Sequence, residues 1–224
     1  MKRIKSFILG FIFIFGTSDK LVSQSSPKVQ IGRVKYGGGG DWYSSKTALK
    51  NLTKFCNFRI KTNLKEEEVI VEVGSEQLFN FPFLFLTGHG NIIFNEGEAK
   101  NLRNYLIAGG FLHICDNYGM DIFIRREMKK VFPELEFKPV PFNHPVYHQQ
   151  FQFNNGLPKV HEHDGKPPLG FGLFWEGKLV CFYDYECDLG NGWEDPELYN
   201  DSPEIREKAL QMGANLIQYA LTLQ

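Results

Sequence analysis

Residues 81–119 decide the fold, and they read FPFLFLTGHGNIIFNEGEAKNLRNYLIAGGFLHICDNYG. Two apolar runs, 81–87 and 111–115, lack the alternation of a half-exposed strand and are typical of strands that are covered on both faces of a parallel sheet. Between them, Asn95 followed three residues later by Glu98 is typical of a helix start, and a glycine pair ends the helix. The stretch therefore predicts a strand–helix–strand unit.

The rest of the chain continues this alternation. Further strands are predicted at 29–36, 68–73 and 178–183, and further helices at 47–58, after residue 119 to about 132, and from 203 onward. Residues 133–168 have little periodicity and are expected to form long loops with short strands. The pattern predicts one α/β domain over residues 24–224, a three-layer sandwich with a mostly parallel sheet. A formal net charge of -1 argues against nucleic acid as a partner.

The N-terminus has the layout of a secretory signal peptide. Lys2, Arg3 and Lys5 precede an apolar run over 7–15, and a polar stretch with small residues follows. We expect residues 1–23 to be removed and the mature protein to be periplasmic or secreted. The alternative is an uncleaved N-terminal anchor. No later segment is long and apolar enough to predict a membrane span.

Polar loops are expected at one edge of the sheet. In open parallel sheets, ligands bind at the carboxyl ends of the strands, near the point where the strand order reverses. This rule selects the loops at 37–45, 87–91 and 116–119. With the loop around residues 140–165 that covers them, the predicted ligand-binding residues are Asp41, Trp42, His89, Asp116, Asn117, Tyr118 and His144.

Histidines are concentrated in the second half of the chain. Four of the six, His144, His148, His161 and His163, fall within twenty residues, and the carboxylates Asp164, Asp184, Glu186 and Asp188 follow them. One hypothesis is a divalent metal such as zinc, held by His89, His161 and His163, with Asp116 as a further ligand or general base. The spacing matches no established metal motif.

Two other interpretations compete with the metal. In one, the site binds a small polar ligand or cell-envelope component without chemistry, against the aromatic surfaces of Trp42, Tyr43, Tyr118, Trp175 and Trp193. In the other, the histidines are structural, as we expect for His113 on a core strand. The glycine run 37–40 is open to a similar choice, between an anion cradle and a turn that lets residues 41–43 reach the strand ends.

Several segments resemble known families. Residues 83–119, together with HPV at 144–146 and GLP at 156–158, look like class I glutamine-amidotransferase-like domains of the trehalose-utilisation-like kind. Over residues 29–222 the chain more closely resembles the uncharacterised bacterial family called domain of unknown function 4159. The shared landmarks are GGGGDWY, TGHG, DNYG, HEHDGKPP and CDLGNGWEDPE. The resemblance implies an amidotransferase-like, flavodoxin-like fold and no particular activity.

One departure from the amidotransferase pattern bears on function. Those enzymes carry a nucleophilic Cys on a tight strand-to-helix elbow, whereas that position falls near Asn117 here and Cys115 lies earlier, within the strand. We therefore do not expect glutamine hydrolysis. Export makes disulfides chemically accessible, and the pairing is not predictable, but strand and helix positions favour buried free thiols at Cys56, Cys115, Cys181 and Cys187.

Three functions remain open on the sequence. The first is a ligand-binding module of the cell envelope without amidotransferase activity. The alternative is a metal-dependent hydrolase that acts on a carbohydrate or other envelope-derived substrate. The third is a structural partner in an envelope complex, which requires an exposed apolar patch.

Overall fold

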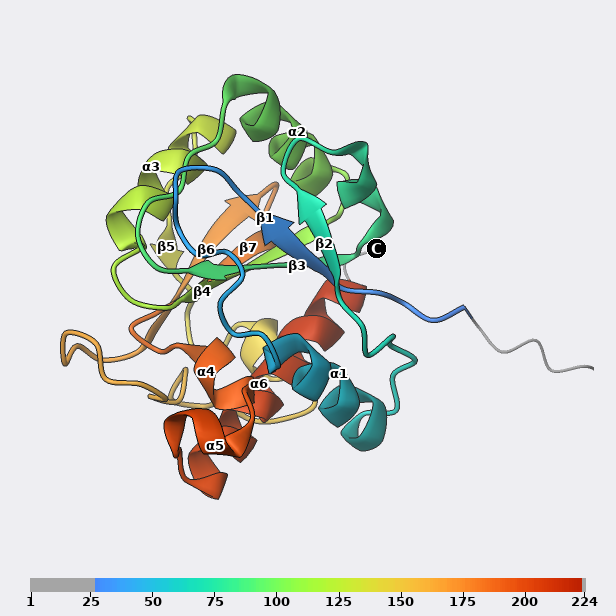
Figure 1. Ribbon diagram of the computed structural model, residues 1–224, viewed down its shortest axis with the longest axis vertical. Coiled ribbons are helices and arrows are strands. Elements are labelled where there is room, and N and C mark those ends of the chain that lie inside the picture. The colour runs from blue at the N-terminus through green and yellow to red at the C-terminus, as the bar shows by residue number, and fades with distance from the viewer. Residues whose placement is uncertain (1–26, 223–224) are drawn as a thin grey trace, which may run out of the picture.

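The computed structural model describes residues 27–222, which form a single seven-stranded sheet with helices on both faces (Figure 1). The strand order is β2-β1-β3-β4-β7-β6-β5. The first five strands in this order are parallel, β6 is antiparallel to β7, and β5 is antiparallel to β6. The strands are β1 (Gly32–Lys35), β2 (Val69–Glu72), β3 (Phe83–Gly88), β4 (Phe111–Asp116), β5 (Lys138–Pro139), β6 (Leu169–Trp175) and β7 (Lys178–Tyr185).

Two hydrophobic cores lie on the two faces of this sheet. One contains residues of α1 (Ala48–Arg59), α4 (Leu189–Trp193) and α6 (Pro203–Thr222), and the other contains residues of α2 (Glu96–Ile107) and α3 (Asp121–Val131). Figure 1 shows these two groups of helices on opposite sides of the sheet. The short helices η1 (Glu76–Asn80), η2 (Pro145–Tyr147) and α5 (Pro196–Tyr199) lie in connections. The predicted α/β sandwich with a mostly parallel sheet is confirmed.

The strand–helix–strand unit at the centre forms for the predicted reasons. Every residue of β3 and β4 is buried, as expected for strands that are covered on both faces. The side chain of Asn95 accepts a hydrogen bond from the backbone N–H of Glu98, and the Glu98 carboxylate accepts one from the N–H of Asn95. This reciprocal cap fixes the first residue of α2.

The four cysteines are free and buried, as predicted. Among residues 27–222, no helix is long and apolar enough to cross a membrane. The predicted signal peptide, residues 1–23, lies outside the described residues.

Candidate functional site

The loops that follow β1, β3, β4 and β7 meet at the carboxyl edge of the sheet. The chain order reverses between β1 and β3, since β2 lies on the far side of β1 and β4 on the far side of β3. Such a reversal sends neighbouring loops to opposite faces and leaves a crevice between them. The predicted loops 37–45, 87–91 and 116–119 all border this position.

A buried arginine holds the first of these loops in place. Arg33 on β1 is only 2% exposed, and its guanidinium donates hydrogen bonds to the carbonyl oxygens of Ser44 at 2.7 Å and Ser45 at 2.8 Å. Its Nε is 2.8 Å from the carboxylate of Glu68. Because the fork of donors is planar and rigid, Arg33 fixes the path of the loop that follows its own strand.

The glycine run before this loop acts as a turn, as one of the two interpretations predicted. Gly38 and Gly39 have φ values of 102° and 87°, a region that favours glycine. The N–H of Gly40 donates to the carbonyl of Asn91 at 3.0 Å, and the amide of Asn91 donates to the carbonyl of Gly38 at 3.1 Å. The turn is thereby tied to the loop after β3, which places Asp41 beside His89.

Asp41 and His89 form a hydrogen-bonded pair at the rim of the site. The Asp41 carboxylate lies 3.0 Å from Nδ1 of His89 and also accepts a hydrogen bond from the His89 backbone N–H. The amide nitrogen of Asn117 is 3.5 Å from the same Nδ1 and 3.1 Å from Oγ of Ser44. The His89 side chain is 52% exposed, and no hydrogen bond to its Nε2 is found within residues 27–222. Asp41 thus orients the ring and leaves Nε2 available.

Four buried carboxylates lie beneath the crevice: Asp116, Asp184, Glu186 and Asp188. Backbone groups satisfy much of their hydrogen-bonding capacity. Asp184 accepts from the N–H of Asp116 at 2.8 Å and from that of Leu189 at 3.1 Å, and Asp116 accepts from the N–H of Glu186 at 3.1 Å. Glu186, Asp188 and the nearby Tyr118 all have positive φ, which is uncommon outside glycine and clusters at functional sites.

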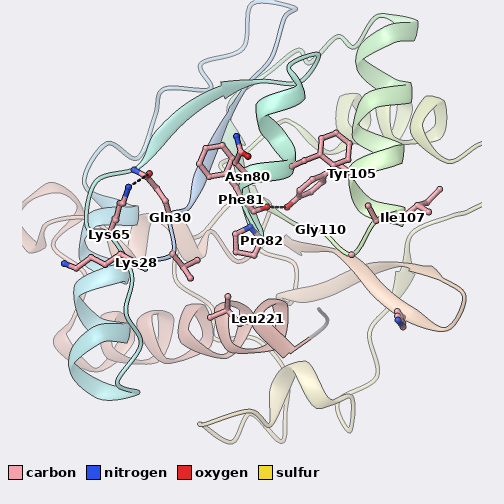
Figure 2. Close-up of a pocket in the computed structure, with 15 residues that line it drawn as sticks. Lys28, Gln30, Lys65, Asn80, Phe81, Pro82, Tyr105, Ile107, Gly110 and Leu221 are labelled. Carbon is pink, nitrogen blue, oxygen red and sulfur yellow. Dashed lines mark hydrogen bonds between the residues drawn. The ribbon is translucent and has the colours of Figure 1, made fainter. Parts of the chain in front are cut away.

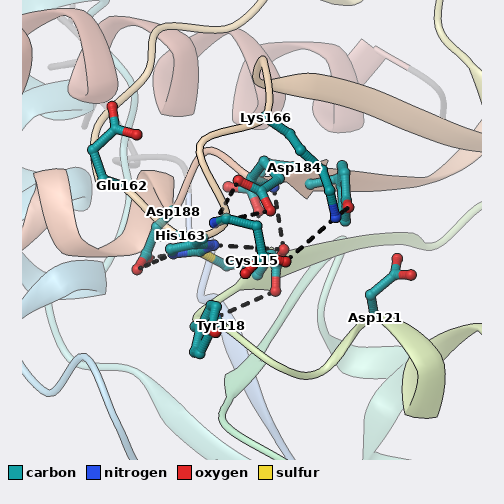
Figure 3. Close-up of polar contacts among 12 residues, drawn as sticks. Cys115, Tyr118, Asp121, Glu162, His163, Lys166, Asp184 and Asp188 are labelled. Atoms are coloured by element: carbon teal, nitrogen blue, oxygen red, sulfur yellow. Dashed lines mark hydrogen bonds and ion pairs between the residues drawn. The ribbon is translucent and has the colours of Figure 1, made fainter.

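His163 inserts between two of these carboxylates. Its Nδ1 is 3.8 Å from Asp116 and its Nε2 is 3.6 Å from Asp188, and the side chain is 2% exposed. Figure 3 shows the His163 ring beside Asp188, close to Tyr118, whose ring centroid is 5.3 Å away. Burial alone lowers the pKa of His163, but the nearby carboxylates of Asp188 and Asp116 outweigh it, so the pKa is raised.

Two of these carboxyl groups, Asp116 and Asp188, have pKa values that are shifted in the direction of the neutral acid. Burial, together with the charge of Asp184, raises the pKa of Asp116 to about 6 despite the hydrogen bond from the Glu186 N–H. Burial likewise raises the pKa of Asp188. Burial thus favours the protonated forms of Asp116 and Asp188, and the carboxylates favour the protonated form of His163 between them, which is the arrangement expected of a proton-exchanging site.

A pocket of about 250 Å³ opens above this cluster. Its lining is almost entirely polar and aromatic, and five of the residues are predicted site residues: His89, Asn117, Tyr118, His161 and His163. Asp188 and Glu162 contribute carboxylates, and Asn191 and Tyr199 complete the wall. Asp116 and Asp41 lie behind the lining, in contact with His163 and His89 respectively. The structure thus brings together residues from four separate loops.

Two predicted ligand-binding residues are placed elsewhere. His144 precedes η2, where its Nδ1 accepts from the N–H of Val146 at 3.2 Å and its ring packs against Phe174 and Tyr219. Tyr219 in turn contacts Phe111, the first residue of β4, so His144 lies toward the opposite edge of the sheet. Its role is structural because it caps a turn and fills core space.

Trp42, the second of these residues, does not line the pocket. Its ring is half-buried against the core on the α2 side and meets Tyr43 edge-to-face at 5.5 Å. Of the other proposed stacking surfaces, Trp193 is buried, with its Nε1 bonded to the carbonyl of Ala209, and Trp175 packs on Phe132. Tyr118 is the one proposed stacking residue that faces the pocket.

The three proposed metal ligands share the pocket without forming a metal centre. The ring centroids of His161 and His163 are 5.8 Å apart, and His89 is held by Asp41. Within the described part of the chain, no group of three or more His, Cys, Asp or Glu side chains is arranged to hold a metal ion. His113 is buried among Phe85, Trp193 and Phe182, as expected for a structural residue.

Asn191 and Tyr199 are site residues that the sequence reasoning missed. Both belong to short helices, α4 and α5, which have too few residues for a periodic pattern. The available signal is the segment CDLGNGWEDPE at 187–197, which contributes to the sequence analysis only as a landmark of the family resemblance.

A larger groove of about 900 Å³ lies at the other edge of the sheet (Figure 2). It lies among the start of β3, the end of α2 and the segment before β1, and its lining includes Phe81, Tyr105, Gly110 and Lys65. Within the part of the chain that the structure describes, no His, Asp, Glu or Cys side chain lines this groove. The smaller pocket at the carboxyl edge is therefore the candidate functional site.

Comparison with known proteins gives a family and no activity. The family model described as "Domain of unknown function (DUF4159)" matches residues 30–221. No curated protein matches the chain.

Proposed function

The chain belongs to the family of the domain of unknown function DUF4159, and we propose that in this protein the domain is a ligand-binding module of the cell envelope. One observation carries the proposal. Side chains from four loops converge on a pocket of about 250 Å³ at the carboxyl edge of the sheet, where open α/β sheets bind their ligands. The size of the pocket suits a small polar molecule of the dimensions of a monosaccharide or an amino acid.

A fold of the amidotransferase-like kind is part of this proposal. The order β2-β1-β3-β4-β7 follows the 2-1-3-4-5 order of doubly wound, flavodoxin-like sheets. Amidotransferase chemistry is not part of it, because Cys115 is fully buried in β4. Burial, with the charges of Asp184 and Asp188, raises its pKa well above the ordinary value, which disfavours the nucleophilic thiolate.

The experiment is a ligand screen with a pocket variant. Residues 24–224, which include the whole sheet and both cores, are screened by ligand-observed NMR against sugars, amino sugars, amino acids and peptidoglycan fragments. His161→Ala combined with Tyr199→Ala removes two exposed pocket side chains and should abolish binding of a true ligand. Leu198→Ala is the matched control, since Leu198 is exposed on the same short helix and does not line the pocket.

The location of the protein in the cell envelope is a separate part of the proposal. It is supported by the basic residues Lys2, Arg3 and Lys5 before the apolar run 7–15. Residues 1–23 fused to a reporter enzyme that is active only after export should give activity. Replacement of Phe11 and Phe13 by Asp should abolish it, and N-terminal sequencing of the exported form tells a cleaved peptide from a retained anchor.

A second candidate function is hydrolysis of an envelope-derived substrate, favoured by the Asp41–His89 pair. A carboxylate on Nδ1 with a free Nε2 facing a pocket is the arrangement of a general base. A ligand found in the screen should then be converted on incubation, as followed by mass spectrometry, and His89→Gln should stop conversion while leaving binding. The metal-dependent version requires about one metal ion per chain, lost when His161 and His163 are changed to Ala.

A further inference from the structure

We propose that the carboxyl-edge pocket selects a compact organic cation, such as an ammonium group on a sugar or small amine. This inference rests on the proposed ligand-binding function and names its ligand class. The first support is the charge of the walls. Asp188 and Glu162 line the pocket, Asp116 lies behind it, and among residues 27–222 no Lys or Arg side chain lines it.

The cations nearest to the cluster are already paired with carboxylates. Lys159 pairs with Glu186 at 3.1 Å and lies 3.9 Å from the pocket carboxylate of Glu162. Lys166 lies 3.3 Å from Asp164 and 3.0 Å from the hydroxyl of Tyr185. His163 supplies one positive charge when protonated, and it sits between two carboxylates. Asp116, Glu162, Glu186 and Asp188 therefore outnumber the two cations beside them, Lys159 and His163, and this excess of carboxylates favours a cationic ligand over a phosphate or carboxylate.

A buried acceptor without a donor is the second, independent support. Asn191 lines the pocket and is 5% exposed, and its amide nitrogen donates to Asp188 at 2.6 Å. That hydrogen bond fixes the amide orientation when Asp188 is ionised, because an ionised carboxylate can only accept. The other atom, Oδ1, is buried and has no hydrogen-bond partner. A buried acceptor in this state requires a donor, and an ammonium group has three.

The aromatic walls are the third support. Tyr118 and Tyr199 are both partly exposed and line the pocket. Tyrosine rings attract cations through their negative faces, and the attraction increases where the cation loses water. The ring of His161 lies 6.1 Å from that of Tyr199, and the ring of His163 lies 5.3 Å from that of Tyr118. Each tyrosine ring therefore contacts a histidine ring edge-to-face. Acidic and aromatic walls together are the usual recognition chemistry for an ammonium group.

The experiment compares matched probes at pH 7, where tetramethylammonium is charged, glucosamine is largely charged, and Asp116, with a pKa of about 6, is largely ionised. Glucosamine is paired with its neutral N-acetyl derivative and with anionic glucuronate, and tetramethylammonium is paired with neutral tert-butanol. Dissociation constants for residues 24–224 are measured by NMR titration. We expect at least one cation to bind about tenfold more tightly than its neutral match, and glucuronate to bind most weakly.

Variants place the selectivity in the pocket. Glu162→Gln removes an exposed wall charge and should weaken the cation severalfold without affecting the neutral probe, and Tyr199→Leu should weaken it further. Glu197→Gln is the matched control, an exposed acid on α5 that does not line the pocket, and should change neither. Far-ultraviolet circular dichroism checks that each variant is folded.

The outcomes separate this inference from the proposed function. Equal or tighter binding of the neutral or anionic probe, lost in the His161→Ala and Tyr199→Ala variant, overturns the cation preference and leaves the binding function standing. If no cation binds while another compound from the screen does, the cation preference is likewise overturned and the binding function stands. Cation binding that survives this double variant overturns the assignment to the pocket.

Discussion

Oδ2 of Asp41 lies 3.0 Å from Nδ1 of His89, although the two residues are 48 positions apart in the chain. The pairing depends on the reversal of strand order between β1 and β3, since the loops after those strands would otherwise not be neighbours. It also depends on Gly88, whose added Cβ would lie 3.1 Å from the backbone of Asp41. The carboxylate determines which ring nitrogen of His89 carries the proton.

Loss of the Asp41 carboxylate should therefore change the tautomer of His89. In the wild-type protein, we expect the neutral ring to carry its proton on Nδ1, where Asp41 accepts it. In Asp41→Ala, the Nε2–H form should become populated, as measured by the ¹⁵N chemical shifts of the ring in the selectively labelled protein. His148, whose ring nitrogens bond to Gln152 and the carbonyl of Phe142, serves as the internal control. An unchanged His89 spectrum would show that Asp41 does not orient the ring.

Arg33→Met should destabilise the fold more than the loss of a surface ion pair. Arg33 is buried and is the donor to Glu68, Ser44 and Ser45, so its removal leaves these acceptors without their partner. Breaking one side of a buried pair of this kind costs about 3 kcal/mol of unfolding free energy, measured by urea denaturation. Lys35→Met is the matched control on the same strand, where the pair with Glu72 is exposed and screened. Equal losses of unfolding free energy in the two variants would mean that the buried hydrogen bonds of Arg33 stabilise the fold no more than an exposed ion pair does.

The central unit of the fold could be predicted because its signals are local. The apolar runs of β3 and β4 and the cap at Asn95 depend on neighbours within a few residues. β6 was not predicted, because Gly170 and Gly172 interrupt its apolar pattern. Neighbouring side chains approach both glycines too closely for a larger residue. A Cβ added at Gly170 would lie 2.2 Å from Tyr147 Oη, and one added at Gly172 would lie 2.3 Å from a methyl group of Leu179.

The candidate site could be predicted only in part, for a related reason. His89 and Asn117 directly follow β3 and β4, so the strand ends place them. His144 was predicted at the same site because the loop around residues 140–165 was expected to cover the strand ends, and it lies instead beside Tyr219. Asn191 and Tyr199 reach the pocket through long-range packing of α4 and α5, which no local pattern encodes.

The thiols should be unreactive in the folded protein. All four are free and buried, and burial raises the pKa of Cys56 to about 12. Cys115, Cys181 and Cys187 are shifted in the same direction by burial. We expect no reaction with a water-soluble disulfide reagent in native buffer, and four thiols per chain in urea. Fewer than four in urea would indicate a disulfide in the protein, and rapid native reaction would indicate an exposed thiol.

Asp116→Asn should remove part of the dependence of stability on pH. Burial raises the folded-state pKa of Asp116 from 3.8 to about 6, so between these values the folded protein binds more protons than the unfolded chain. The unfolding free energy must therefore fall as pH rises through this window, by on the order of 3 kcal/mol from this group. The raised pKa of His163 acts with the same sign at higher pH, since the stability it contributes is present below its ordinary value of 6.5 and is lost as pH rises through the raised value.

The difference in unfolding free energy between wild type and variant separates the contribution of Asp116 from that of the other carboxylates of the protein. Urea denaturation from pH 4 to 8 should give a wild-type curve that falls more steeply than that of Asp116→Asn. Glu136→Gln, which removes an exposed carboxylate outside the cluster, should keep the wild-type slope. Parallel wild-type and Asp116→Asn curves would mean that Asp116 is ionised throughout this range. In that case His163, whose Nδ1 lies 3.8 Å from Asp116, would be paired with a carboxylate and could not exchange a proton with it.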